Sequence, residues 1–165
     1  MTEESPLARK LGITPGCSIC LLDAPAPSAA LLREACPPGV ALTEDESGDH
    51  QERQERQERQ ERQERQERYD LIFLWPQCLD GLTAQLAALQ WRIHPSGAIW
   101  VMLLKKPVAR RRGVTLTWED TQAAALLTDL VDNKIAAFSE EEYGTRFVIR
   151  RERRPLYAAP EPADH

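Results

Sequence analysis

Three short stretches of the chain are continuously apolar, and they constrain the fold more than any other feature. They are Ser18–Leu22, Tyr69–Pro76 and Ala98–Leu104. A strand with one buried face alternates apolar and polar residues, whereas a strand buried on both faces is apolar throughout. Strands of the second kind form parallel sheets that helices cover on both sides. The sequence therefore predicts a parallel sheet at the centre of the fold.

Helix signals lie between these strands. Ser5-Pro6 favours a short helix up to Leu11, because serine caps the free N–H groups of a helix start and proline suits the first turn. Within Leu79–Arg92, leucines recur at the spacing of one buried helix face. The other expected elements are helices at Ala29–Ala35, capped by Ser28, and from Thr117 to about Thr128; strands at Val40–Thr43, Lys134–Ser139 and Thr145–Arg150; and a basic loop at Lys105–Gly113.

The order of these elements predicts the fold class. Alternating strands and helices form a mainly parallel sheet with helices on both faces. The short segment Glu140–Gly144 joins the last two strands as a hairpin, so the last strand is antiparallel. We therefore expect an α/β protein with a small Rossmann-like sheet and a C-terminal antiparallel hairpin.

Six copies of Gln-Glu-Arg fill positions 51–68 and interrupt this pattern. Most of the Glu residues stand four positions before an Arg, which stabilises a helix by ~0.2–0.5 kcal/mol per pair. The repeat has no apolar stripe that could dock on a core, so we expect a solvated helix or a helix–coil mixture. We interpret it as a functionally neutral insertion; a spacer or a partner-binding arm is the alternative.

The repeat also sets the expected division of the chain. Outside it, 147 residues remain, enough for one domain with a hydrophobic core and too few for two ordinary domains. We expect 1–43 and 69–151 to be the two halves of that domain. An acidic linker with the repeat occupies 44–68 between them, and 152–165, rich in Pro, Ala and charge, is expected to be a flexible tail.

The charge of the chain argues against a general nucleic-acid binder. The net charge is −5 at pH 7, and the neutral repeat leaves the acidic excess in the rest of the chain. Basic residues gather at 105–112 and 146–154, which we expect at opposite edges of the sheet. No apolar run approaches the ~20 residues that span a bilayer, and the polar N-terminus does not resemble a secretory signal. We expect a cytoplasmic protein without membrane or nucleic-acid contacts, and a protein partner stays open.

The cysteines, Cys17, Cys20, Cys36 and Cys78, are few for a disulfide framework. Cys17 and Cys20 have the spacing of a metal or redox pair, but they begin a predicted strand, where residues three apart point to opposite faces. No second cysteine pair or nearby histidine completes a metal site. We therefore expect buried structural thiols and no bound metal.

Several short segments of the chain match known patterns. The stretch Tyr69–Lys106 is similar to the strand–helix–turn–strand segment of class I methyltransferases, whose fold ends in a hairpin. A larger set of segments comprises Ser5–Ile13, Thr14–Gly16, Leu21–Pro25, Tyr69–Leu74, Gly97–Val101, Lys105-Lys106, Leu130–Lys134 and Gly144–Phe147. On these, the chain resembles the bacterial domain of unknown function 3052 family, which implies a methyltransferase-like fold and no particular activity. It departs from that family at the last hairpin, where Glu142-Tyr143-Gly144 replaces a Trp-Ser-Gly-like turn.

The methyltransferase resemblance implies S-adenosylmethionine bound over a Gly-rich loop after the first strand. The corresponding loop, Asp23–Ser28, has no glycine, and its two prolines lack an N–H and have a fixed φ. An acid after the second strand would bind the ribose, and Glu44 stands near that position within an acidic segment. An amine-methylating site would also need Asp or Asn where Leu74-Trp75 stand. We therefore expect a degenerate methyltransferase-like domain without a cofactor.

Two groups of residues are candidate ligand contacts. Lys105 and Lys106 follow a strand at the edge where open α/β sheets bind ligands, and a solvated loop is the alternative. Asp132, Asn133 and Lys134 are expected at a helix-to-strand turn, where a ligand-facing role competes with a purely structural one.

No catalytic constellation is evident in the sequence. The histidines, His50, His94 and His165, fall in a linker, a turn and the C-terminus. We expect a non-catalytic binding or protein-interaction module. The alternatives are a divergent small-molecule enzyme or methyltransferase, and an anion- or nucleic-acid-binding accessory protein.

Overall fold

The computed structural model describes residues 5–45 and 68–158, so most of the repeat and both chain ends lie outside the described residues. The strands are β1 (Ser18–Leu22), β2 (Ala41–Asp45), β3 (Tyr69–Leu74), β4 (Ile93–Leu104), β5 (Leu130–Ala137) and β6 (Glu142–Ile149). The helices are α1 (Pro6–Leu11), α2 (Ala26–Ala35), α4 (Leu82–Leu89), α5 (Lys106–Arg112), α6 (Trp118–Leu126) and α7 (Arg154–Ala158), with a 3-10 turn, η1, at Arg151–Arg153.

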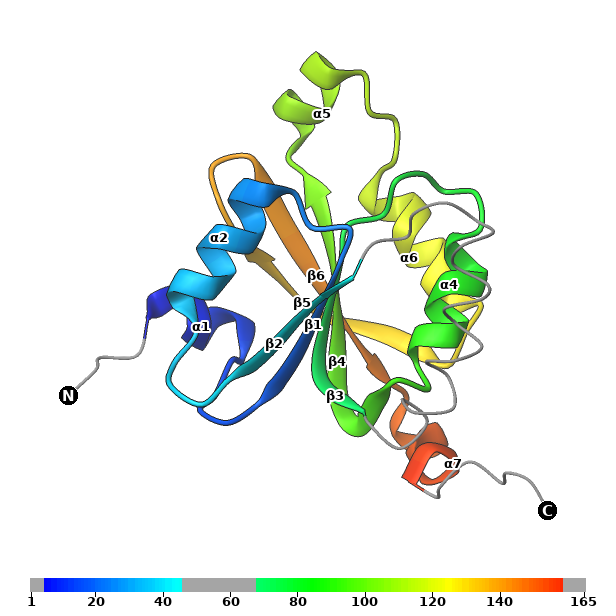
Figure 1. Cartoon of the computed structure of the whole chain (residues 1–165). Coiled ribbons are helices and arrows are strands. Elements are labelled where there is room, and N and C mark those ends of the chain that lie inside the picture. Colours follow the sequence, from blue (N-terminus) through cyan, green and yellow to red (C-terminus); the bar gives the residue numbers. More distant parts are fainter. Residues whose placement is uncertain (1–4, 46–67, 159–165) are drawn as a thin grey trace.

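The strands form one sheet in the order β2-β1-β3-β4-β6-β5 (Figure 1). β2, β1, β3 and β4 are mutually parallel, whereas β6 runs antiparallel to both β4 and β5. This confirms the predicted α/β class, with a mainly parallel sheet and an antiparallel hairpin at the C-terminal end. α1 and α2 cover one face of the sheet, and α4, α6 and α7 lie on the other (Figure 1).

The apolar strands are buried on both faces, as their composition predicts. In β3, Leu71 and Phe73 pack in the layer under α1 and α2, whereas Ile72 packs in the layer under α4 and α6. Cys17 and Cys20 are both buried and fall in these two different layers. The spacing of the two cysteines therefore reflects a strand and not a shared metal or redox site.

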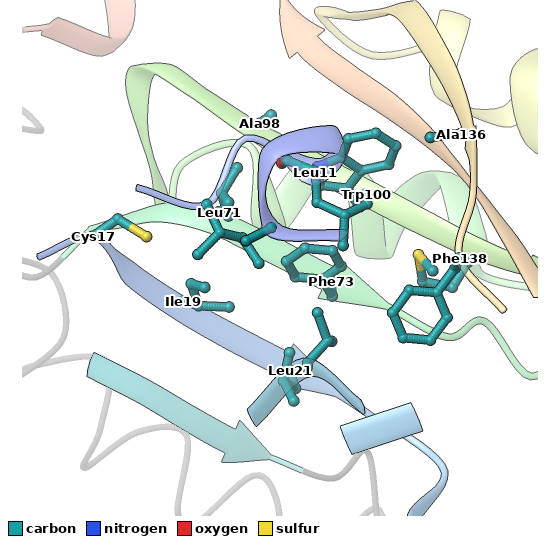
Figure 2. Packing of buried hydrophobic residues seen from close by; sticks show 14 of the residues in the cluster. Leu11, Cys17, Ile19, Leu21, Leu71, Phe73, Ala98, Trp100, Ala136 and Phe138 are labelled. Atoms are coloured by element: carbon teal, nitrogen blue, oxygen red, sulfur yellow. The ribbon is translucent and has the colours of Figure 1, made fainter. Parts of the chain in front are cut away.

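Trp100 anchors the layer under α1 and α2 (Figure 2). Its ring stacks on Phe73 with centroids 6.3 Å apart, and its indole N–H donates to the carbonyl of Leu11 at 3.1 Å. That carbonyl lies at the C-terminal end of α1, where backbone oxygens lack partners within the helix. The bond therefore satisfies a buried polar group and fixes α1 against the sheet.

The helix ends follow the predicted capping signals in two places. The Ser5 hydroxyl accepts hydrogen bonds from the N–H groups of Leu7 and Ala8, and Gly12 ends α1 with φ of 77°. Thr117 and Asp120 form a reciprocal capping box at the start of α6. Both helices thus begin where short polar side chains replace the missing backbone acceptors.

The predicted basic loop at Lys105–Gly113 is wrong, because most of it forms α5. Pro107 suits the first turn of this helix, and Gly113 ends it in the left-handed region with φ of 69°. The sequence prediction thus gave more weight to the basic residues than to the proline near the helix start and the glycine at the helix end, which α5 shares with α1.

The predicted turn at Asp132-Asn133-Lys134 is also wrong, because these residues lie inside β5. The pairing of β5 with β6 shifts register between Asp132 and Lys134, which accommodates the polar triplet as an irregularity of the strand. β6 begins at Glu142, three residues before the expected start, so the connecting segment is shorter than predicted.

Other boundaries differ as well. Glu44 and Asp45, expected to open the linker, are the last residues of β2. The expected turn 94–97 belongs to β4. Part of the expected flexible tail forms η1 and α7, because Tyr157 is only 1% exposed and anchors the segment. None of the described helices is long and apolar enough to cross a membrane.

Candidate functional site

A buried carboxyl group lies at the edge of the sheet where the parallel strands end. Glu142 opens β6 and pairs with Leu104, the last residue of β4. Because β6 is antiparallel, its first residue lies at the carboxyl edge of the parallel strands. The Glu142 residue is only 7% exposed. Open α/β sheets hold their ligands at this edge, so a buried acid here is the first feature to explain.

Two side chains from distant parts of the chain donate hydrogen bonds to Glu142. The indole Nε1 of Trp75, the residue directly after β3, lies 2.9 Å from Oε2. The Ser28 hydroxyl, in the first turn of α2, lies 2.5 Å from Oε1. Both donor residues are 5% exposed. These three residues, the Trp75–Glu142–Ser28 cluster, therefore join β3, β6 and α2 inside the protein.

Backbone and ring contacts hold this cluster in place. The N–H of Trp75 donates to the carbonyl of Leu22 at 3.1 Å, which extends the pairing of β1 and β3. The Trp75 ring meets the edge of Phe138 with centroids 6.4 Å apart. The N–H of Phe138 donates in turn to the carbonyl of Glu142 at 3.0 Å. The three side chains of the cluster are thus part of the packed interior and not of a cleft wall.

Ser28 does not have its predicted role as a helix cap. α2 begins at Ala26, and its N-cap is Pro25, which makes no side-chain bond. Proline near the first turn sets the backbone angles of a helix start without a capping side chain. Ser28 therefore lies inside the first turn, and its hydroxyl is used by Glu142.

The loop between β1 and α2 is joined to the neighbouring strand. Asp23 has φ of 60°, in the left-handed region that favours glycine, and its N–H donates to the carbonyl of Asp45 at 3.0 Å. Nearby, Glu44 of β2 forms an ion pair with Arg33 of α2. The Asp23 N–H and the Glu44 carboxylate are thus both engaged within the protein.

Lys105 and Lys106 lie at this same edge. Lys105 is the N-cap of α5, and its N–H donates to the carbonyl of Glu141 at 2.8 Å. Lys106 is exposed. α5 extends away from the sheet beyond the end of β4 (Figure 1), and an ion pair between Arg112 and Glu141 links its far end back to β6. The helix therefore presents a basic surface beside the Trp75–Glu142–Ser28 cluster.

In the second predicted group, Asp132–Lys134, two of the three side chains make contacts within the fold. The Asp132 carboxylate accepts hydrogen bonds from Gln122 of α6 at 3.2 and 3.3 Å, whereas Asn133 is exposed. The ammonium group of Lys134 donates to the carbonyl of Lys10, near the end of α1, at 2.7 Å.

The structure does not bring the two predicted groups together. Lys134 pairs with Arg146, in the middle of β6. Lys105 lies beyond the end of β4, which pairs with the first residue of β6. The two groups are therefore separated along and across the sheet, and they form no common site.

The second basic cluster lies at the opposite, amino edge of the sheet, as predicted. There the Arg153 guanidinium contacts the Asp129 carboxylate at 3.3 Å, and the Tyr157 hydroxyl donates to the same carboxylate at 2.5 Å. Burial, followed by this hydrogen bond, raises the pKa of Tyr157 well above its ordinary value. Part of this cluster thus fastens α7 to the body of the protein.

Several solved structures share this architecture. A TehB-like S-adenosylmethionine-dependent methyltransferase from Corynebacterium glutamicum superposes with a TM-score of 0.53 at 11% identity, covering 90% of each chain. A proposed methyltransferase from Thermoplasma acidophilum gives 0.55 at 11% identity, covering 92% of this chain and 77% of that one. A protein studied in the conversion of a disulfide bond into a thioacetal group during echinomycin biosynthesis gives 0.54 at 11% identity, covering 96% and 86%.

The fold is that of class I methyltransferases. At 11% identity this likeness shows the fold alone and carries no activity to the present chain. No protein-family model matches the chain, and no curated protein matches it significantly. The narrower resemblance to the domain of unknown function 3052 family is not confirmed and stays a prediction.

Sequence reasoning missed the Trp75–Glu142–Ser28 cluster. Ser28 and Glu142 are 114 positions apart, and Glu142 was expected in a hairpin connection. A serine near a helix start is explained by capping, and a glutamate near a turn is explained by the connection between two strands. Neither residue therefore indicated a long-range contact. Only the antiparallel register of β6 brings this glutamate to the end of β3.

Proposed function

We propose that this protein is a non-catalytic binding module built on a methyltransferase-like fold. The Trp75–Glu142–Ser28 cluster carries the proposal. Open α/β sheets hold their ligands at the carboxyl edge, and the methyltransferase resemblance implies a cofactor over the loop after the first strand, at this edge. Here that edge holds a hydrogen-bonded cluster of three buried side chains, each less than a tenth exposed. Opening the edge to a ligand would break these bonds and expose Trp75.

The residues around this edge do not fit S-adenosylmethionine. A cofactor cradle needs backbone N–H groups and close approach, which glycines supply. Asp23 takes a glycine-like conformation, but its N–H is already bonded to Asp45. Pro25 and Pro27 have no N–H to offer. Glu44, the acid nearest the expected ribose contact, is paired with Arg33.

We propose that the binding surface of the module is the basic helix α5. Lys106, Arg110 and Arg111 are exposed on it, and the helix extends beyond the sheet where a partner can reach it (Figure 1). An acidic protein surface is the complementary partner. A long nucleic acid is a weaker candidate, because the other basic cluster lies at the opposite edge and the chain is acidic overall. Membership of the domain of unknown function 3052 family is part of this proposal.

The experiment is a calorimetric titration of the purified protein with S-adenosylmethionine and, separately, with S-adenosylhomocysteine. The Corynebacterium glutamicum methyltransferase is a positive control under the same conditions. We expect no heat beyond dilution for the present protein. Saturable binding tighter than about 100 μM, roughly −5.5 kcal/mol, would contradict the proposal and restore an enzyme as the leading explanation.

A further inference from the structure

A recess lies at the amino edge of the sheet, away from the Trp75–Glu142–Ser28 cluster. It has a volume of about 290 Å³ and lies between the loop that joins α1 to β1 and the first residues of β3 and β4. Arg146 of β6 contributes a guanidinium group to its lining. Thr14 and Ser96 contribute hydroxyl groups, and Asp70 contributes a carboxylate. The recess is therefore lined by one cation mounted on a strand, one carboxylate and two hydroxyl-bearing residues.

Close backbone packing builds one side of this recess. The pairing of β3 with β4 is irregular here. Tyr69 pairs with Ile93 and Leu71 pairs with Ala98, so β4 has more residues than β3 between the two pairs. A Cβ atom at Gly97 would lie 2.7 Å from the carbonyl oxygen of Asp70. Only glycine permits this approach of the two backbones. The shape of the recess therefore depends on a specific residue and not on mobile surface side chains.

Arg146 is a charged side chain with no counter-ion among residues 5–45 and 68–158. It is half-buried, and within the described part of the chain its guanidinium makes no hydrogen bond or ion pair. Burial, followed by the charge of Arg154, lowers the pKa of Arg146. Removing an unpaired cation from water costs free energy, which an anion bound in the recess would offset.

A further cation lies directly opposite. Lys134 of β5 pairs with Arg146, so the two side chains stand on the same face of the sheet. Like charges in such cross-strand positions destabilise a sheet. The bond from Lys134 to the carbonyl of Lys10 engages one cation but supplies no negative charge. Lys134 and Arg154 thus add positive charge in the neighbourhood of Arg146.

Asp70 compensates only part of this charge. One of its oxygens, Oδ2, accepts hydrogen bonds from the N–H of Ser18 at 2.8 Å and from the Ser18 hydroxyl at 3.3 Å. The other, Oδ1, lies 4.0 Å from Nε2 of His94. The carboxylate is thus engaged by its own neighbours, and no ion pair joins it to Arg146 among the described residues.

We propose that this recess binds the phosphate group of a small phosphate monoester, with Arg146 as its principal contact. The planar guanidinium group donates two parallel hydrogen bonds to a phosphate. A phosphate monoester carries a charge of about −1.5 to −2 at neutral pH, so it attracts Arg146 and the neighbouring cations more strongly than a single carboxylate does. The recess is large enough for this group and a small organic part. The proposal concerns the opposite edge from α5 and does not depend on the proposed function.

The test is a calorimetric titration with inorganic phosphate at constant ionic strength, with acetate as the monoanionic comparison. We expect saturable binding of phosphate and none of acetate. Arg146→Gln should weaken phosphate binding at least tenfold, whereas Arg110→Gln, which removes an exposed arginine of α5, should leave it unchanged. The proposal is overturned if the unaltered protein shows no saturable phosphate binding, or if both variants bind phosphate equally well.

A second measurement avoids dependence on the folding of the Arg146→Gln variant. In the unaltered protein labelled with ¹⁵N, phosphate should shift the amide resonances of Thr14, Ser96 and Gly97 with a common saturation curve. Shifts confined to residues 105–113 would assign the binding to α5 and overturn the proposal.

Discussion

Glu142→Ala tests whether the Trp75–Glu142–Ser28 cluster holds the carboxyl edge of the sheet together. The substitution removes the acceptor of two hydrogen bonds, at 2.9 Å from Trp75 and 2.5 Å from Ser28. Both donors are buried, so neither regains a full set of bonds to water. We therefore expect a large loss of stability from the removal of a single polar side chain.

The magnitude follows from the two donors that remain. A buried hydrogen-bonding group left without its partner costs about 1–3 kcal/mol, so two donors cost roughly 2–6 kcal/mol. Partial entry of water into the vacated space reduces this toward the lower half of the range. We expect a decrease of about 3 kcal/mol in the free energy of unfolding, which corresponds to a fall of roughly 6–12 °C in Tm for a chain of this size.

The neighbouring residue supplies a matched control. Glu141 is exposed, and its ion pair with Arg112 is a surface contact worth less than about 1 kcal/mol. Urea unfolding should be followed by far-ultraviolet circular dichroism, because the fluorescence of Trp75 itself depends on Glu142. Equal losses of stability in Glu142→Ala and Glu141→Ala would refute the argument, since only Glu142→Ala leaves buried donors without an acceptor.

Three further predictions concern other parts of the fold. Tyr157→Phe should lower stability by about 1–2 kcal/mol, because it removes the hydrogen bond to Asp129. Because the pKa of Tyr157 is raised by burial and by this bond, the advantage of the unaltered protein is complete below about pH 10 and is lost as the pH rises further. Urea titrations of both proteins as a function of pH measure it, and a difference that grows above pH 10 would contradict the assignment. Cys78 is exposed and should react with a thiol reagent in the native protein, whereas Cys17 and Cys20 are buried and should react only on unfolding; burial also raises the pKa of Cys17. Pulsed alkylation with peptide mass spectrometry identifies the sites, and equal rates at all three would argue against the described packing. Gly97→Ala should cost about 2 kcal/mol, because its Cβ would meet the backbone carbonyl of Asp70, whereas Ser96→Ala should have little effect; similar urea midpoints for the two variants would show that the backbones are not in close contact.

The fold was predictable because its strongest signals are local. A continuously apolar run such as Ala98–Leu104 excludes a half-exposed strand, and a sequence of such runs with helices between them leaves few topologies. The errors arose where local signals conflicted. Pro107 and Gly113 bound a helix, but the basic residues between them resembled a solvated loop.

The polar segment within β5 shows a second kind of error. Asp132-Asn133-Lys134 has the composition of a turn, yet pairing with β6 holds it in a strand with a register shift. Such pairing is a property of the assembled sheet, and tertiary context overrides the local preference. The same residues were proposed as ligand contacts, and Lys134 is the one that pairs with Arg146, a residue of the recess lining.

The candidate site was less predictable than the fold. The absence of glycine between Asp23 and Ser28 drew attention to that loop, but the sequence alone did not indicate what the loop contacts. Three residues from separate elements meet there, and their meeting depends on the register of the last strand. Arg146 likewise looked like one of several surface arginines until its strand placed it, half-buried, on the lining of a recess.

We propose that buried side chains close the carboxyl edge of the sheet, where open α/β sheets bind ligands, against a cofactor. The most direct measurement is a titration of the ¹⁵N-labelled protein with S-adenosylhomocysteine, observed at the amides of Asp23, Ala24 and Ser28 and at the indole N–H of Trp75. We expect these resonances to stay unchanged up to millimolar ligand. Saturable shifts of the same resonances would show that the edge opens to the cofactor and that the buried cluster does not close it.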